Sequence, residues 1–158
     1  MINRLSFHFT AMSRITCCLL FLAIVVVTLM TDSATAKLYD RCSMAWQLEN
    51  IGIPKDEMAT WVCLAEKTSQ FNSKAVTKKR DGSHNYGIIP INDRQWCARP
   101  SGPSGRNQCN IKCKDLLVDS ITPAMNCAQL IRERRGWTAW SEWYLCDGHL
   151  PSLKDCFK

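Results

Sequence analysis

The 158-residue chain has no internal repeat, no low-complexity tract and, after about residue 30, no long apolar run. A membrane-spanning helix needs about 20 consecutive, mostly apolar residues. Because no later segment supplies them, we expect no membrane span beyond the N-terminal region.

The chain also has no strong excess of one charge. Its 20 Lys and Arg residues against 14 Asp and Glu residues leave a formal net charge of +6. That balance would suit an anionic surface such as a bacterial wall, but it is equally ordinary for a secreted protein. It therefore identifies no partner by itself, and we expect none among nucleic acids.

The apolar run that the chain does contain lies near its N-terminus, from about Ile15 to Met30. Arg4 and Arg14 precede the run, and Ala34-Thr35-Ala36 follows it with the small-x-small pattern that signal peptidase accepts. A membrane anchor is the alternative, but about 16 residues are too few to span a bilayer comfortably. We therefore predict that residues 1–36 are a signal peptide and that the protein is secreted and extracellular.

Residues 37–158 would then form a single domain containing eight cysteines. An even number of cysteines in a short secreted chain predicts disulfides, here four, although spacing alone leaves 105 pairings open. A zinc site built on Cys109 and Cys113 is the alternative, which the oxidising compartment disfavours. The cysteines are Cys42, Cys63, Cys97, Cys109, Cys113, Cys127, Cys146 and Cys156.

Hydrophobic spacing predicts helices toward both ends of this domain and a small sheet between them. Helices are expected over residues 39–50, with Gly52 beyond the end, and from Asp56 to about Ser69. Thr122-Pro123 predicts the N-cap and first residue of another helix that ends at Gly136, and residues 137–145 a short aromatic helix or turn. Between them, Asp81-Gly82-Ser83 indicates a turn and Tyr86-Gly87-Ile88-Ile89 a strand that Pro90 interrupts.

Short motifs spread over essentially the whole of residues 37–158 resemble the C-type lysozyme and alpha-lactalbumin family, glycoside hydrolase family 22. All eight cysteines are in place, and the C-terminal end is most similar to insect members. The motifs are Lys37-Leu38-Tyr39-Asp40-Arg41-Cys42, Trp61-Val62-Cys63, Phe71-Asn72, Asp81-Gly82-Ser83, Tyr86-Gly87-Ile88, Ile91-Asn92, Trp96-Cys97, Cys109-Asn110-Ile111 with Cys113, Asn126-Cys127-Ala128, Gly136-Trp137-Thr138-Ala139-Trp140 and Leu150-Pro151-Ser152-Leu153 with Cys156.

The resemblance implies an α+β fold in which a helical lobe and a small antiparallel sheet lobe flank a sugar-binding cleft. It also implies a disulfide pairing: Cys42 with Cys156, Cys63 with Cys146, Cys97 with Cys113, and Cys109 with Cys127.

The two positions that the family uses for catalysis hold no carboxylate here. Family members hydrolyse the β-1,4 link of peptidoglycan with a glutamic acid and an aspartate, and lysozyme is the standard example of this chemistry. The acid position, five residues after Cys63, is Thr68, and the aspartate position, just before Tyr86, is Asn85. A threonine hydroxyl is too weak an acid, and an amide carries no charge to set against an oxocarbenium ion. We therefore expect negligible hydrolysis.

Two neighbours, Glu66 and His84, could in principle substitute. On a helix Glu66 points roughly 200° away from Thr68, and on a strand His84 emerges on the opposite face from Asn85. We therefore expect Glu66 to be a solvated helix residue and His84 a turn or surface residue.

The sugar-binding positions that the resemblance implies survive better. Main-chain groups beside Asn92 and Ala139 would hold an acetamido group between Trp96 and Trp140. One aromatic of the usual pair is missing, because Gln95 precedes Trp96, and Pro90 replaces a polar residue on the cleft floor. Trp140 could also serve only as a core residue, and that alternative stays open.

We expect no cofactor and no metal. The calcium-binding branch of the family uses aspartates in the loop after Cys113, and the matching positions here offer too few oxygen donors: Val118, Ser120, Pro123 and Ala124. We also expect a monomer.

The favoured function is a secreted, non-catalytic lysozyme-like protein that binds N-acetylglucosamine-containing glycans, or a protein partner at a cell surface, through the degenerate cleft. The replacements resemble those of sperm acrosomal lysozyme-like proteins, which suggests gamete recognition, and glycan sensing in immunity fits equally well. The alternative is an active or weak muramidase in antibacterial defence or digestion. A third interpretation is a modifier subunit that acts on another enzyme, as alpha-lactalbumin does.

Overall fold

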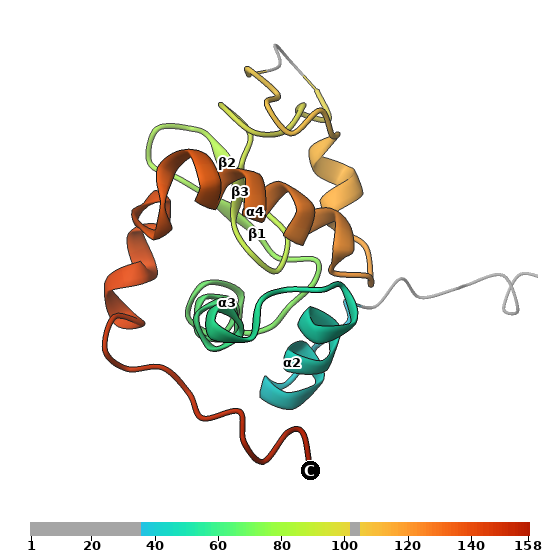
Figure 1. Cartoon of the computed structure of the whole chain (residues 1–158). Coiled ribbons are helices and arrows are strands. Elements are labelled where there is room, and N and C mark those ends of the chain that lie inside the picture. The colour runs from blue at the N-terminus through green and yellow to red at the C-terminus, as the bar shows by residue number, and fades with distance from the viewer. Residues whose placement is uncertain (1–35, 102–104) are drawn as a thin grey trace, which may run out of the picture. The chain divides into compact units, whose positions relative to one another are not determined.

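The computed structural model describes residues 36–101 and 105–158 (Figure 1). The predicted signal peptide lies outside the described residues except for Ala36, which begins a unit that extends to Lys158. No helix within the described ranges is long and apolar enough to cross a membrane. The elements are α2 (Arg41–Asn50), α3 (Lys55–Ser69), β1 (Val76–Lys78), β2 (His84–Tyr86), β3 (Ile91–Asn92), the 3₁₀ helix η1 (Cys113–Leu116), α4 (Thr122–Arg135), and the 3₁₀ helices η2 (Trp137–Ala139) and η3 (Ser141–Leu145).

Helix α2 starts at a capping box. The Asp40 carboxylate accepts hydrogen bonds from the backbone N–H groups of Cys42 and Ser43, and the Ser43 hydroxyl oxygen accepts one from the N–H of Asp40. The bond from the Ser43 N–H is the main cause that lowers the pKa of Asp40. The helix ends before Gly52, whose φ of 78° no other residue type adopts as easily.

The core of the helical region is built around α3. Trp61, with no exposed surface, lies edge-on to Trp137 and Trp140, at centroid distances of 4.6 and 5.4 Å. Trp137 also stacks on Trp143 from the following 3₁₀ helix. The predicted aromatic segment is therefore two short 3₁₀ helices whose rings close the end of the core.

The small sheet is antiparallel, in the order β1-β2-β3, with Asn85 opposite Asn92 in its register. The strand predicted over 86–89 is wrong in its extent, because β2 ends at Tyr86. Gly87 has a φ of +87°, and a Cβ atom there would lie 3.1 Å from the Leu116 carbonyl oxygen. The chain turns at this point, while Ile88 and Ile89 remain buried as core residues rather than strand residues.

Helix α4 contacts β3 and lies across the sheet in Figure 1. Its N-terminus differs from the prediction by one residue: Ile121 is the N-cap, Thr122 is the first helical residue, and no side chain caps this end. The C-terminus agrees with the prediction, with Gly136 following three arginines of the last turn. One of them, Arg132, forms an ion pair with Glu57 in the first turn of α3.

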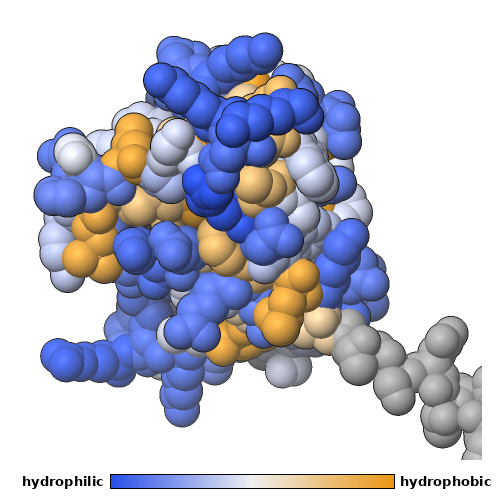
Figure 2. Space-filling view, turned by 90° about the horizontal axis from the view of Figure 1, so that it is seen from below, coloured by the Kyte–Doolittle hydropathy of each residue, from blue (hydrophilic) through white to orange (hydrophobic). Residues whose placement is uncertain are grey.

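All four disulfides that the resemblance implies are present: Cys42–Cys156, Cys63–Cys146, Cys97–Cys113 and Cys109–Cys127. The alternative of a zinc site on Cys109 and Cys113 is therefore wrong, because each sulfur is bonded elsewhere. The first bridge ties the C-terminal segment to α2, where Arg41 contacts Asp155. Figure 2, which views the molecule from below, shows separate apolar patches among hydrophilic side chains on this face.

Candidate functional site: a cleft without its carboxylate pair

A small cavity of about 50 Å³ lies where the sheet faces the segment after α4. All four predicted sugar-binding residues and one of the two degenerate positions, Asn85, line it together. The lining residues are Lys79, Asn85, Pro90, Asn92, Trp96, Ile131, Ala139, Trp140, Ser141 and Glu142. The fold therefore brings together residues from β2, β3 and the two C-terminal 3₁₀ helices.

A second, larger hollow of about 240 Å³ adjoins this cavity and shares Trp96 and Ala139 with it. Its other lining residues are Gln95, Arg135 and Thr138. Ligand pockets typically measure about 300–1,000 Å³, so the smaller cavity alone cannot enclose a sugar ring, whereas the two together approach that range. The larger hollow is the part of the cleft with room for a ring.

Thr68 does not line either cavity. It is half-buried in the last turn of α3, and its hydroxyl donates a hydrogen bond of 2.6 Å to the carbonyl oxygen of Leu64, one turn back. Threonine makes this bond readily, because its side chain is short and its hydroxyl reaches the carbonyl oxygen four residues earlier in the helix. The side chain at the predicted acid position is therefore engaged with its own helix.

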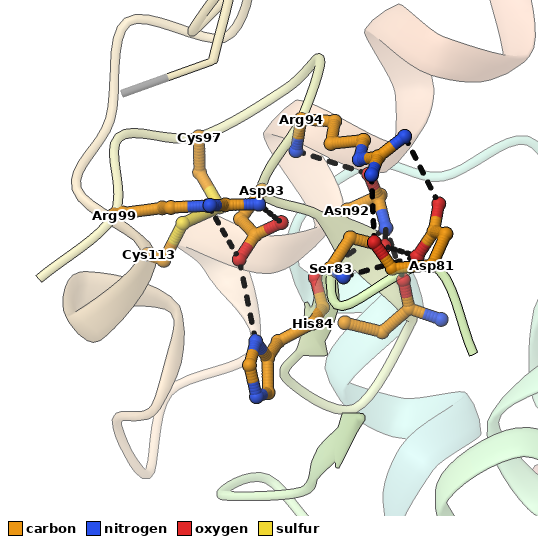
Figure 3. Close-up of polar contacts among 10 residues, drawn as sticks. Asp81, Ser83, His84, Asn92, Asp93, Arg94, Cys97, Arg99 and Cys113 are labelled. Atoms are coloured by element: carbon orange, nitrogen blue, oxygen red, sulfur yellow. Dashed lines mark hydrogen bonds and ion pairs between the residues drawn. A yellow bond between two sulfur atoms is a disulfide. The ribbon is translucent and has the colours of Figure 1, made fainter. Parts of the chain in front are cut away.

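Asn85, in contrast, lines the small cavity and is joined to a chain of hydrogen bonds through Asn92, which Figure 3 shows beside Ser83 and Asp81. The Asn92 side-chain N–H₂ donates to the Asn85 Oδ1 atom and to the Ser83 hydroxyl, each at 3.0 Å, while Ser83 donates to Asp81 at 2.6 Å. The Asn92 side-chain Oδ1 atom accepts a hydrogen bond from the backbone N–H of Arg94. One of the two lone pairs of the Asn85 oxygen is therefore engaged by Asn92.

Asp93, the residue after Asn92, points to the opposite side of the sheet. Figure 3 shows it between Arg99 and His84. The Asp93 side chain is 1% exposed and lies 3.0 Å from Arg99 Nε and 3.6 Å from His84 Nδ1. The Nε contact lacks hydrogen-bond alignment, but another nitrogen of Arg99 donates to Asp93 at 3.1 Å. Burial, and then the charge of Asp93, raise the pKa of Tyr86.

This cluster corrects one prediction and agrees with another. His84 does face away from Asn85, but it is half-buried against a buried carboxylate rather than a free surface residue. Glu66 is exposed and pairs with Lys67, as expected of a solvated helix residue.

The two cleft tryptophans are largely buried, at 6% exposure for Trp96 and 4% for Trp140. The Trp140 ring N–H donates to the Pro90 carbonyl oxygen at 3.1 Å, and the ring packs on Trp61. Trp140 therefore has a core role whatever else it does. Trp96 is the aromatic shared by both hollows.

Comparison with known proteins agrees with this geometry. The family model described as C-type lysozyme/alpha-lactalbumin family matches residues 37–156. The chain belongs to this family. It is 48% identical over 139 residues to Lysozyme 2 of Lucilia sericata, covering 87% of this chain and 98% of that protein, and 43% identical to Lysozyme B of Drosophila melanogaster, covering 85% and 96%. The crystal structure of recombinant wild-type canine milk lysozyme in its apo form matches with a TM-score of 0.65 at 34% identity, over 71% of this chain and 91% of that one.

The structure also brings to the small cavity a carboxylate that the sequence pattern does not predict there. Glu142 lies in η3, half-buried, with its Oε2 accepting a hydrogen bond of 2.9 Å from the Ser141 hydroxyl. Its place in the sequence, two residues after Trp140, was visible, but nothing in the spacing indicated that a 3₁₀ turn would carry it to the cavity.

Glu142 is the one carboxylate among the residues that line the two hollows. Family 22 chemistry uses two carboxyl groups, one to donate a proton and one to stabilise the cation or attack it. A single carboxylate can fill only one of these roles.

Elsewhere in the described ranges, the one group of possible metal ligands is Cys42, Cys156 and Asp155, and its two cysteines are joined in a disulfide.

Proposed function

We propose that this protein is a secreted, non-hydrolytic member of the C-type lysozyme family that binds N-acetylglucosamine-containing glycans through its cleft. The observation that carries the proposal is a contrast between the predicted acid position and the two hollows. The predicted acid position holds a threonine bonded to its own helix, while Asn92, Trp96, Ala139 and Trp140 line two adjoining hollows. A role in immunity or in gamete recognition, on glycans at a cell surface, is consistent with this site.

The chemistry of the two degenerate positions supports the loss of hydrolysis. The Thr68 hydroxyl would have to give up its bond to Leu64 and still could not protonate a glycosidic oxygen at neutral pH. The loss of a general acid alone costs about 10²- to 10⁴-fold in rate. Asn85 keeps the place of the second carboxylate but not its charge, so the same step loses its electrostatic stabilisation as well.

The larger hollow supports retained sugar binding. The face of a pyranose ring is apolar at its axial C–H groups, and a tryptophan surface beside a few polar groups suits it. Trp96, which is 6% exposed, supplies a small tryptophan surface in this hollow, and Gln95 and Thr138 supply polar side chains.

The test is a calorimetric titration of the mature protein with chitotriose. We expect saturable binding that weakens about three- to tenfold in Trp96→Leu, as expected for the loss of one stacking contact. Trp46→Leu is the matched control, because Trp46 is half-exposed on α2 and its ring N–H bonds to Cys156 near the C-terminus. No heat and no change in tryptophan fluorescence at millimolar ligand would refute the proposal.

The second candidate is a weak muramidase, and the observation that favours it is Glu142 in the small cavity. A peptidoglycan suspension separates the two candidates. Under the favoured proposal, the wild-type protein clears it no faster than a heat-inactivated sample. Clearing above that control, and its loss in Glu142→Gln, would instead assign Glu142 as the acid and overturn the non-hydrolytic proposal.

A further inference from the structure

The larger hollow contains a cation that sugar binding by a neutral ring does not require. Arg135, the last residue of α4, lines it together with Gln95, Trp96, Thr138 and Ala139, and no carboxylate lines it. Cations at a helix C-terminus complement the helix dipole, which accounts for the three arginines of the last turn. The dipole does not account for the position of Arg135, which lines the same hollow as Trp96.

Arg135 also differs from its neighbours in its partners. Arg132 pairs with Glu57, and Arg134 donates a hydrogen bond of 2.7 Å to the Gln108 side chain. Arg94, next to Gln95, pairs with Asp81. Within residues 36–101 and 105–158, the Arg135 guanidinium forms neither an ion pair nor a side-chain hydrogen bond.

The adjoining small cavity has a different balance. Its lining contains one cation, Lys79, and one anion, Glu142, so the two formal charges cancel. The positive charge of the cleft is therefore concentrated at Arg135, on the side with room for a ring. A guanidinium presents five donors in a plane that matches the oxygens of a sulfate or a carboxylate.

From this arrangement we infer that the cleft selects acidic glycans: an N-acetylglucosamine-containing sugar that carries a sulfate or carboxylate group, with its ring against Trp96 and its anionic group on Arg135. The inference rests on the proposed function, because it names the ligand class of that same cleft. Thr138 and Gln95 at the rim can donate further hydrogen bonds to the anion. An anionic group placed in the adjoining cavity would meet Glu142 as well as Lys79, so no net charge favours that orientation.

The experiment titrates the mature protein with three ligands that differ only at C6 of the sugar: chitotriose, its 6-O-sulfated form and its C6-carboxylate form. We expect the anionic ligands to bind about three- to tenfold more tightly than chitotriose at low salt, which is the range for one partly exposed ion pair reinforced by hydrogen bonds. The preference should shrink as the salt concentration rises. Comparison of the sulfated with the carboxylated ligand identifies which group the site takes.

The variants Arg135→Gln and Arg134→Gln remove the same charge from adjacent residues. Arg135→Gln should abolish the preference, read as the ratio of the anionic ligands' affinity to that of chitotriose, whereas Arg134→Gln should keep that ratio, since Arg134 is bonded to Gln108 outside the hollow. Equal affinity of all three ligands in the wild type, or a preference that survives Arg135→Gln, would overturn the inference. Chitotriose binding without any anion preference leaves the proposed function standing, whereas failure of all three ligands to bind removes both.

Discussion

The two sides of the β2–β3 hairpin differ in charge: the cleft side holds neutral amides, and the far side holds a buried carboxylate with its cation. On the cleft side, Asn85 and Asn92 are neutral amides joined by a hydrogen bond of 3.0 Å. On the far side, Asp93 is a carboxylate with 1% exposure, held between Arg99 and His84. Asn92, the last residue of β3, and Asp93, which follows it, belong to the two different networks (Figure 3).

The contrast shows which charges the fold depends on. The hydrogen bond that the Asn92 side chain donates to Asn85 needs only an acceptor oxygen at position 85. An aspartate offers such an oxygen as well as an asparagine does. An exchange between asparagine and aspartate at position 85 therefore preserves this hydrogen bond. Asp93 has no such freedom, because a buried carboxylate without its cation carries a large desolvation cost. The cleft side is therefore free to change its chemistry while the far side preserves the hairpin.

The largest expected effect comes from breaking the far side. Arg99→Met removes the cation that contacts both oxygens of Asp93 and leaves the carboxylate buried. We expect the free energy of unfolding to fall by about 3 kcal/mol, the lower end of the range for a broken buried pair, because the Arg99 side chain is 26% exposed. Urea denaturation followed by circular dichroism measures the loss.

The control for this prediction is Asp93→Asn combined with Arg99→Met. Removal of both charges should cost clearly less than Arg99→Met alone, because no unpaired charge remains. An equal or greater loss in the double variant would mean that the arginine stem, rather than its charge, stabilises this side of the hairpin.

The second prediction restores charge to the cleft side. Thr68→Glu combined with Asn85→Asp should raise the clearing rate of a peptidoglycan suspension at least ~10²-fold above wild type, since both carboxyl roles are then filled. The Asn85→Asp change keeps an acceptor for Asn92, so we expect little change in unfolding free energy, in contrast to the far-side variants.

Each single variant of this pair should remain near the wild-type rate, because one carboxylate fills one role only. If the double variant folds and still fails to clear the suspension, the small volume of the cavity at Pro90, rather than the missing carboxylates, limits hydrolysis. That outcome would also weaken the contrast drawn between the two sides of the hairpin.

Most of the fold was predictable because its signals are local or carried by whole motifs. The helix ends at Gly52 and Gly136 follow from residues that tolerate positive φ, and both are observed. The α+β fold and the four disulfide pairs came from the resemblance to the family, and both are confirmed. Spacing alone left the pairing open.

The features that sequence did not predict depend on contacts between distant segments. The early end of β2 is imposed by the approach of Leu116 to Gly87, and the burial of His84 by an aspartate nine residues later. The arrival of Glu142 in the cavity depends on how a 3₁₀ turn packs against the sheet. No periodicity encodes any of these three, because each is a matter of tertiary geometry.

The smallest expected effect concerns Ser83, which links the Asn92 amide to Asp81 on the cleft side. The Ser83 hydroxyl bond, and then its backbone N–H bond, lower the pKa of Asp81. Ser83→Ala should therefore raise the pKa of Asp81 toward its ordinary value, measured by a carboxyl ¹³C NMR titration. A lowered folded-state pKa stabilises the protein above the unfolded pKa and ceases to do so as the pH falls through the folded value. Asp81's share of the stability difference between wild type and variant should thus vanish in acid, while Asp40, whose pKa is lowered by α2, serves as the control that does not move. An unchanged Asp81 pKa would contradict this prediction. It would mean that Ser83 orients Asn92 without stabilising the charge of Asp81.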